Sequence, residues 1–290
     1  MSSTLIFDHA ILVVNDLPVA MRQFTQLGFT VTPGGVHAGA LTHNALIAFA
    51  DGAYLELLAT TRRSTATLLK VLYFTRMLRF YAPAKTPIGK RLLTGIAGGV
   101  GLSDFALHSQ DLDQHLSAIQ QRGLTLDGPQ PGGRRRPDGQ QVSWRTAVPP
   151  AIDLPFLIDD VSPRPARVPG GDAQRHANAV SGVAGIMVAV PDLGKIAARY
   201  RALLGVDLQE PSQFPLPGAR SIDFALGSTI LTLLEPARGN ATLRKSLAAR
   251  STRPLAIWLQ TTSPEGSSQI ALTYLPGRGF TLSHSNPWAL

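Results

Sequence analysis

The sequence contains no cysteine and is sparing in aromatic and charged residues. Of its 290 residues, 7% are aromatic and 16% are charged. Because cysteine is absent, the chain can form no disulfide, no thiolate metal site and no cysteine nucleophile. This composition is compatible with a reducing cytosol, and we expect a cytoplasmic protein.

Several familiar signals are also missing. No window offers the roughly 18 uninterrupted apolar residues of a membrane span. The opening residues, MSSTLIFDHAILVVND, have no basic start and reach Asp8 early, so we do not expect a signal peptide. There is no glycine-rich dinucleotide fingerprint after a strand, no P-loop, no serine nucleophile elbow and no His-Glu-x-x-His zinc motif.

Acidic residues are absent from residues 57–103, which are rich in arginine and lysine. The whole chain has a formal net charge of +8, but its basic residues form no tail and no arginine–aromatic stripe, so we expect no nucleic-acid partner. Within the acid-free stretch, TATLLKVLYFTRMLRFY predicts a helix that is apolar nearly all round. We expect a docked structural helix. The alternatives are a lid over a ligand site and, less favoured, attachment to a membrane surface.

A strand–helix–strand–strand–strand order recurs along the chain. The first copy has a strand over 5–14, a helix that starts after Asn15-Asp16 and stops at Gly28, and a hairpin around Asp51-Gly52. The second copy begins with residues 101–124 and continues with strands near 130–136, 140–147 and 154–159. The third begins with 182–206 and continues with 219–236. A degenerate fourth copy is expected to follow.

The segment SPRPARVPGGDAQRHAN is rich in proline, glycine and arginine, which is typical of a linker. It divides the chain into three parts. We expect paired βαβββ modules over 1–161, with a helical insertion at 62–98, a linker at 162–179, and the third and worn fourth modules over 180–290. The predicted class is α+β.

Glu56 stands inside YLELLA, a strand that otherwise consists of core residues. A carboxylate buried there costs several kcal/mol unless it is paired or binds a metal. Because alternate residues of a strand share a face, partners can be sought on the matching faces of neighbouring strands. The expected inward faces are Leu5, Phe7, His9, Ile11 and Val13; Tyr54, Glu56 and Leu58; and Asp104, Ala106 and His108.

Paired modules that open with DHAILVVNDL and close with YLELLA resemble the vicinal oxygen chelate superfamily, which includes glyoxalase I, extradiol dioxygenases and bleomycin-resistance proteins. More narrowly, TPGGVHAGALTHNALIAFADGAYLELLA and GRRRPDGQQVSW resemble the glyoxalase-like domain proteins. The resemblance covers the first ~160 residues well, and the third module by its pattern. It implies mixed curved sheets that form an open cup with helices packed outside.

The resemblance also implies a metal site, because ligands in such folds come from the first and last strands of each module. Carried over to this chain, the ligands are His9, Glu56 and Asp104, which suit a divalent Fe, Mn, Ni or Zn ion. The implied activity is that of a lyase, isomerase or dioxygenase on a small oxygenated molecule. Glu56 is then the catalytic proton carrier, with His43 as acid/base or substrate contact at the cup mouth.

Further side chains are candidates for substrate binding. Tyr54 and His108 are expected on the cup face, and alternation places Arg134 and Arg136 together, where a guanidinium could bind a carboxylate. Trp144 could wall the cup. His37 and His43 flank a glycine-rich loop, and we favour His43 over His37 as a pocket residue.

The alternative is a metal-free protein that binds or sequesters a small molecule on the same fold. The chain supplies three candidate ligands, and matches neither the four of glyoxalase nor the two histidines and one glutamate of extradiol enzymes, so whether it is an enzyme stays open. The third module has Gly185 and Thr232 where His9 and Glu56 stand, so we expect no site there. The expected partner is a small molecule; a membrane is not expected and a homo-oligomer is left open.

Overall fold

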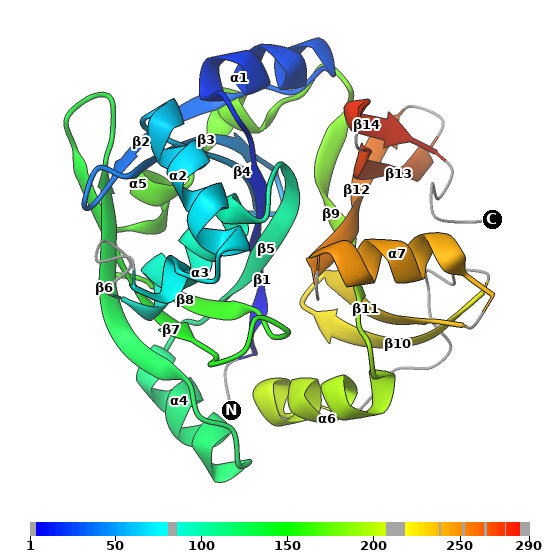
Figure 1. Ribbon diagram of the computed structural model, residues 1–290. Helices are drawn as coiled ribbons and strands as arrows, with labels where there is room; N and C mark the ends of the chain where they lie inside the picture. Colours follow the sequence, from blue (N-terminus) through cyan, green and yellow to red (C-terminus); the bar gives the residue numbers. More distant parts are fainter. Residues whose placement is uncertain are drawn as a thin grey trace.

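The computed structural model describes residues 4–80, 86–206, 218–237, 239–250, 253–263, 266–275 and 277–284. The chain has the α+β class that the sequence predicts. One sheet closes into a barrel of eight strands, and the other is an open sheet of six strands beside it (Figure 1).

The first module has the strand–helix–strand–strand–strand order that its pattern predicts, although its second strand lies in the glycine-rich segment expected to be a loop. In chain order its elements are β1 (Ile6–Val13), α1 (Leu17–Gln26), β2 (Thr32–His37), β3 (Thr42–Ala48) and β4 (Tyr54–Thr60). Helix α1 begins after Asp16, whose side chain accepts a hydrogen bond from the amide of Val19 at 3.0 Å. The tight turn before β4 uses Gly52 at a φ of 86°, a conformation that favours glycine.

The second module repeats this order and closes the barrel. Its elements are β5 (Gly101–His108), α4 (Leu112–Gln121), β6 (Asp127–Arg135), β7 (Gln141–Val148) and β8 (Phe156–Asp160). The strand order around the barrel is β1-β4-β3-β2-β6-β7-β8-β5. The first strands of the two modules, β1 and β5, pair antiparallel, and each also pairs in parallel with the last strand of its own module.

The predicted helical insertion contains α2 (Arg63–Phe74), the 3-10 turn η1 (Leu78–Phe80) and α3 (Pro87–Ala97); residues 81–85 lie outside the described part. We call these three elements the roof, because they cover the opening of the barrel (Figure 1). Leu69 of α2 and Leu93 of α3 pack onto Ile11 and Val13, which face the barrel interior. Helices α1 and α4 pack outside the barrel, as expected.

The face that β1 presents to the interior differs in one respect from strict alternation. The pairing of β1 with β5 shifts register between Phe7 and His9, as at a β-bulge. As a result His9 and Ile11 face the interior, whereas Phe7 packs in the core outside the barrel. The prediction that Phe7 shares a face with His9 is therefore wrong, because alternation is interrupted between them.

The predicted linker folds onto the barrel. It contains the short helix α5 (Arg164–Arg167) and the 3-10 turn η2 (Gly171–Gln174). Arg167 is almost fully buried and forms ion pairs with Asp8 of β1 and Asp160 of β8. The linker is thus part of the wall and not a free tether.

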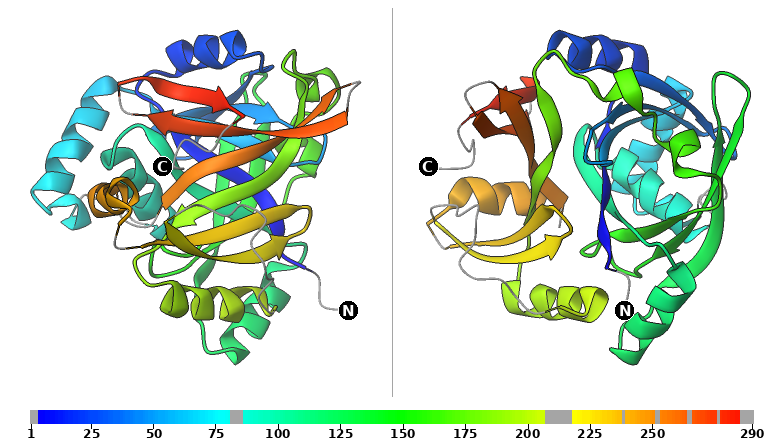
Figure 2. Two further views of the ribbon diagram at one scale, coloured as in Figure 1. Left: turned by 90° about the vertical axis from the view of Figure 1, so that its right-hand side faces the viewer. Right: turned by 180° about the vertical axis from the view of Figure 1, so that it is seen from behind.

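The remaining chain forms the open sheet. Its elements are β9 (Val180–Ala189), α6 (Leu193–Leu204), β10 (Ala219–Leu226), β11 (Thr229–Pro236), α7 (Ala241–Arg250), β12 (Arg253–Ser263), β13 (Gly266–Leu275) and β14 (Gly279–Ser283). The strand order is β10-β11-β9-β12-β13-β14 (Figure 2). Helix α7 is an addition to the predicted elements. The segment expected to hold a worn fourth module contains β12, β13 and β14.

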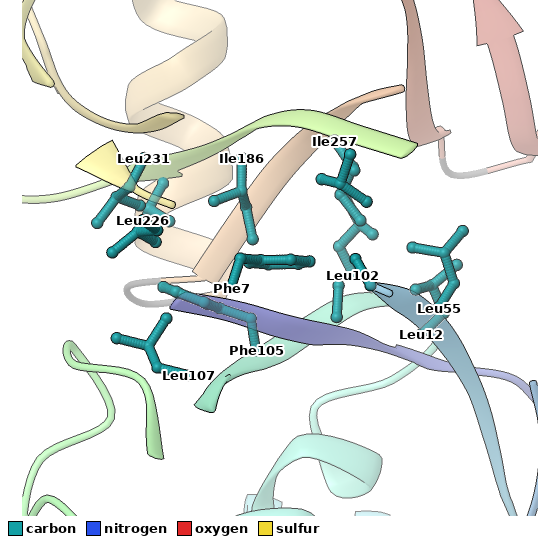
Figure 3. Packing of buried hydrophobic residues seen from close by; sticks show 14 of the residues in the cluster. Phe7, Leu12, Leu55, Leu102, Phe105, Leu107, Ile186, Leu226, Leu231 and Ile257 are labelled. Carbon is teal, nitrogen blue, oxygen red and sulfur yellow. The ribbon is translucent and has the colours of Figure 1, made fainter. Parts of the chain in front are cut away.

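The open sheet and the barrel share one hydrophobic core. Phe7 and Phe105, on the outer faces of β1 and β5, pack against Ile186 and Ile257 of the open sheet (Figure 3). The two aromatic rings stack with centroids 6.3 Å apart. This shared core leaves the barrel interior as a separate space.

Among the described helices, none combines the length and apolar character that crossing a membrane requires.

Candidate functional site

The barrel contains a cavity of about 440 Å³ beneath the roof. Most of its wall is apolar, and the roof contributes from α3. The apolar side chains that line it are Ile11, Leu41, Ile88, Leu92, Leu93, Trp144, Phe156 and Ile158. The polar side chains are His9, His37, Thr42, Tyr54, Glu56, Thr86, Arg134, Thr146 and Arg167.

Glu56 is buried in this wall and is fully engaged by neighbours. Asn44 Nδ2 donates to Glu56 Oε1 at 2.7 Å. His9 Nε2 lies 3.5 Å from Oε2, and His37 Nε2 lies 3.5 Å from Oε1. These partners come from β1, β2 and β3. Their contacts explain why β4 tolerates a carboxylate among its core residues.

The electrostatics of this group favour an ionised Glu56. Burial by itself raises the pKa of Glu56, but the charges of His37 and His9 and the Asn44 hydrogen bond outweigh it and lower that pKa. Burial lowers the pKa of His37, although Glu56 opposes this shift. The cavity therefore holds a carboxylate beside an imidazole that gives up its proton readily.

His9 is oriented by a second carboxylate behind it. Its Nδ1 lies 2.6 Å from Asp8 Oδ1, which leaves Nε2 facing Glu56. Burial by itself raises the pKa of Asp8. The positive charge and hydrogen bonds of Arg167 outweigh this effect and hold the pKa of Asp8 well below its usual range. Arg167 donates to Asp8 from both terminal nitrogens at 2.9 Å, and Arg164 adds a contact at 2.7 Å.

Arg134 is a buried cation in the cavity wall, only 3% exposed. Its Nε donates to the carbonyl oxygen of Gly34 at 3.1 Å, and Nη2 donates to that of Arg167 at 2.5 Å. Among the described residues, its Nη1 has no acceptor. Burial lowers the pKa of Arg134, as expected for a charge held away from water.

Two further polar groups face the same space. Thr146 is 1% exposed, and its Oγ1 has no hydrogen-bond partner among the described residues. Tyr54 stacks on the His9 ring at 4.5 Å and receives a hydrogen bond from Arg167 at 2.7 Å. Burial raises the pKa of Tyr54, so its phenol stays protonated.

The structure gathers five of the sequence-predicted residues at this cavity and leaves four elsewhere. His9, Tyr54, Glu56, Arg134 and Trp144 line it.

Asp104 and His108, the two candidates on β5, lie away from the cavity and already have partners. Asp104 accepts from Arg91 of α3, through Nε at 2.5 Å and Nη2 at 2.7 Å. His108 Nε2 lies 3.3 Å from Asp160.

Arg136 and His43 also lie outside the cavity wall. Arg136 pairs with Asp138 at 2.9 Å and donates to the carbonyl of Ala166. Thr42 lines the cavity and Asn44 bonds to Glu56, so strand alternation turns His43 to the outer face of β3.

Some members of the site carry little signal in the sequence. Asn44 could have been found, because it lies on the inward face of β3, two residues from Leu46, which is directly opposite Glu56. Asp8 is the unpaired residue at the β-bulge between Phe7 and His9, and Arg167 comes from a segment with the composition of a linker. Thr146 looks like any strand threonine until its unpaired hydroxyl is seen.

The residues do not fit the expected metal centre. The expected ligand set requires a donor from the second module, but Asp104 is bound to Arg91. The inward positions of β5 and β8 beside the cavity carry Ala106, Phe156 and Ile158, which cannot bind a metal. Within the described residues, no group of three or more His, Cys, Asp or Glu side chains is arranged to hold an ion. We therefore derive no chemistry through a metal.

Two βαβββ modules that close one barrel around a cavity are the architecture that the resemblance to the vicinal oxygen chelate superfamily implies. The chain belongs to the family described as Glyoxalase-like domain, whose model matches residues 7–204. No curated protein shows a significant match to the sequence.

Solved structures share the fold along nearly the whole chain. A hypothetical protein from Staphylococcus aureus is 15% identical with a TM-score of 0.67, and the match covers 96% of this chain and 98% of that one. A mutant 4-hydroxymandelate synthase from Streptomyces coelicolor is 13% identical with a TM-score of 0.57. That match covers 96% of this chain and 91% of the synthase chain. At these identities the likeness concerns the fold alone.

Proposed function

We propose that the barrel cavity binds a small molecule with an apolar body and a carboxylate or similar oxyanion head, without a metal ion. The observation that carries this proposal is the buried Arg134 guanidinium, which faces the cavity with one nitrogen still without an acceptor among the described residues. A buried cation of this kind gains most from an anionic partner that completes its hydrogen bonds. The unpaired Thr146 hydroxyl supplies a second contact.

The remainder of the wall suits an apolar body. Phe156, Ile158 and Trp144 face the space from the second module, and Leu92 and Leu93 close it from the roof. A volume of about 440 Å³ falls in the range of small-molecule sites. The ligand is therefore expected to be a compact aryl or alkyl carboxylate.

A second candidate function is proton transfer on a bound carbonyl compound, supported by the Asp8–His9–Glu56 chain. Glu56 would take a proton from the carbon next to the carbonyl, and the electron pair would move onto the carbonyl oxygen near Arg134. His9, held by Asp8, would accept or return the proton through Glu56. We rank this second, because a lowered Glu56 pKa makes the carboxylate a weaker base.

Calorimetric titration with 4-phenylbutanoate and its amide tests the binding proposal. The wild-type protein should bind the acid more tightly than the amide, and Arg134→Met should weaken binding of the acid roughly tenfold or more, because a charged hydrogen bond is lost. Arg136→Met is the matched control, since Arg136 also donates to a linker carbonyl but lies outside the cavity. Equal affinity for acid and amide, or equal losses in both variants, would refute the proposal.

Proton transfer has a separate test. In deuterated buffer, the wild-type protein should catalyse exchange of the hydrogens next to the ketone of 4-oxo-4-phenylbutanoate, measured by NMR. Glu56→Gln keeps a side chain of the same size that can still accept the hydrogen bond from Asn44, but it removes the base. Exchange should therefore fall to the uncatalysed rate. No exchange in the wild-type protein leaves a binding protein as the function.

A further inference from the structure

The outer face of the roof carries a concentrated set of exposed apolar side chains. They recur at every third position along α2 and η1: Leu68, Val71, Phe74, Met77 and Phe80. Phe74 is 82% exposed and Phe80 is 65% exposed. Elsewhere in the described chain, large exposed hydrophobic residues are scattered over separate elements. Exposed apolar side chains gathered on one short segment in this way, which we call the patch, indicate an interaction surface.

The roof's packing on the barrel does not account for this patch. Leu69 and Tyr73 lie on the opposite side of α2 and pack in the cluster that covers the barrel opening. Leu68, Val71 and Phe74 therefore face away from the protein's own core. In the left view of Figure 2, α2 lies at the edge of the molecule, where a partner can reach it.

Positive charge surrounds the patch. Arg62 and Arg76 are exposed and Lys70 is half-buried, and residues 57–103 contain no aspartate or glutamate. Among the described residues, the one carboxylate paired with a basic side chain of α2 is Asp16, through Arg63. A second copy of this chain docked face to face would set these like charges against each other. An anionic surface complements them.

We propose that the outer face of the roof docks on an anionic lipid membrane. Phe74 and Phe80 would enter the boundary between headgroups and acyl chains, while Lys70 and Arg76 would lie among the headgroups. This division of apolar and basic groups is that of helices which lie in the plane of a membrane surface. The inference does not depend on what the cavity binds.

Co-sedimentation with vesicles tests the proposal. The full-length protein should bind vesicles of phosphatidylcholine with phosphatidylglycerol, and should bind pure phosphatidylcholine far more weakly. Raising the salt from about 0.1 M to about 0.5 M should weaken binding, because screening shortens the reach of the charges. Phe74→Ser with Phe80→Ser, and separately Lys70→Glu with Arg76→Glu, should each lower the partition coefficient roughly tenfold or more.

Two matched controls separate this surface from general effects. Val161→Ser removes an exposed apolar side chain outside the roof, and Lys195→Glu with Arg201→Glu removes the same amount of positive charge from exposed positions of α6. Both should bind vesicles like the wild-type protein. Equal losses in variants and controls, or no binding to anionic vesicles, would overturn the proposal. So would a wild-type dimer that Phe74→Ser with Phe80→Ser dissociates, if vesicle binding stays unchanged.

Discussion

At the scale of single residues, the site is an arrangement of buried polar groups of which most, but not all, are paired. Glu56 could be singled out from the sequence, because a carboxylate in a core strand needs a partner. Two of its partners were within reach of the same reasoning, since His9 and Asn44 lie on the inward faces of other strands of the same module. His37 was not, because it reaches Glu56 from β2, at the edge of a segment whose glycines predict a loop.

Thr146 provides the sharpest single-residue prediction. Thr146→Val removes a hydroxyl with no protein partner among the described residues, so the free energy of unfolding should stay within about 0.5 kcal/mol or rise. Affinity for a carboxylate ligand should fall by about 0.5–1.5 kcal/mol, the usual value of one hydrogen bond. Urea unfolding and calorimetry measure the two quantities.

The control for this variant lies in the open sheet. Thr232 is also buried, and its Oγ1 has no hydrogen-bond partner within the part of the chain that the structure describes. Thr232→Val should affect stability in the same way and leave ligand affinity unchanged. If ligand affinity survives Thr146→Val as well, the hydroxyl is not a ligand contact.

His37 gives a prediction on pH. Because burial lowers its pKa in the folded state, the unfolded chain binds the proton first, and stability falls as pH drops below the unfolded value of about 6.5. Urea unfolding between about pH 7.5 and about pH 5.5 should show this loss, and His37→Gln should reduce it. An unchanged slope in the variant would contradict a lowered His37 pKa.

At the scale of elements, the sequence predicted the strands and helices of the modules better than it predicted their connections. Caps, glycine stops and turn residues are local signals, and they place α1 and the β3–β4 hairpin correctly. The linker is different: its composition is typical of a tether, yet Arg164 and Arg167 bind it to the barrel wall. Long-range ion pairs of this kind have no local signature.

The linker contact predicts a large effect of Asp8→Asn. This substitution leaves the buried Arg167 with one paired carboxylate, Asp160, in place of two, which should cost about 1.5–3 kcal/mol of stability, the range for a hydrogen bond to a charged group. Asp172→Asn is the control, since Asp172 pairs with Arg175 at a site where its side chain is 91% exposed. That change should stay within about 0.5 kcal/mol, so similar losses in both variants would contradict a structural role for the buried network.

At the scale of the whole molecule, the repeat of modules predicted the architecture, and the resemblance predicted the family. The ligand set did not follow from either. The inherited strand positions in the second module carry Asp104, Phe156 and Ile158, and the structure uses Asp104 to anchor α3 through Arg91. The chain therefore has the barrel of the fold, but its second module supplies apolar side chains to the cavity wall and a structural ion pair to α3.

This reading predicts that metal removal has no effect. Treatment with a chelator should change neither the affinity for a carboxylate ligand nor the free energy of unfolding. Elemental analysis of untagged protein should find less than one equivalent of any transition metal. One equivalent of metal that is lost in Glu56→Ala would contradict the account, and would place a metal centre on His9, His37 and Glu56.

The central claim is that an oxyanion head lies against Arg134 while an apolar body fills the barrel. The most direct measurement is a crystal structure with 4-(4-bromophenyl)butanoate, in which anomalous scattering locates the bromine. We predict bromine among Phe156, Ile158 and Leu92, and carboxylate oxygens within hydrogen-bond distance of Arg134 Nη1. A ligand bound elsewhere, or one with its carboxylate turned away from Arg134, would contradict the claim.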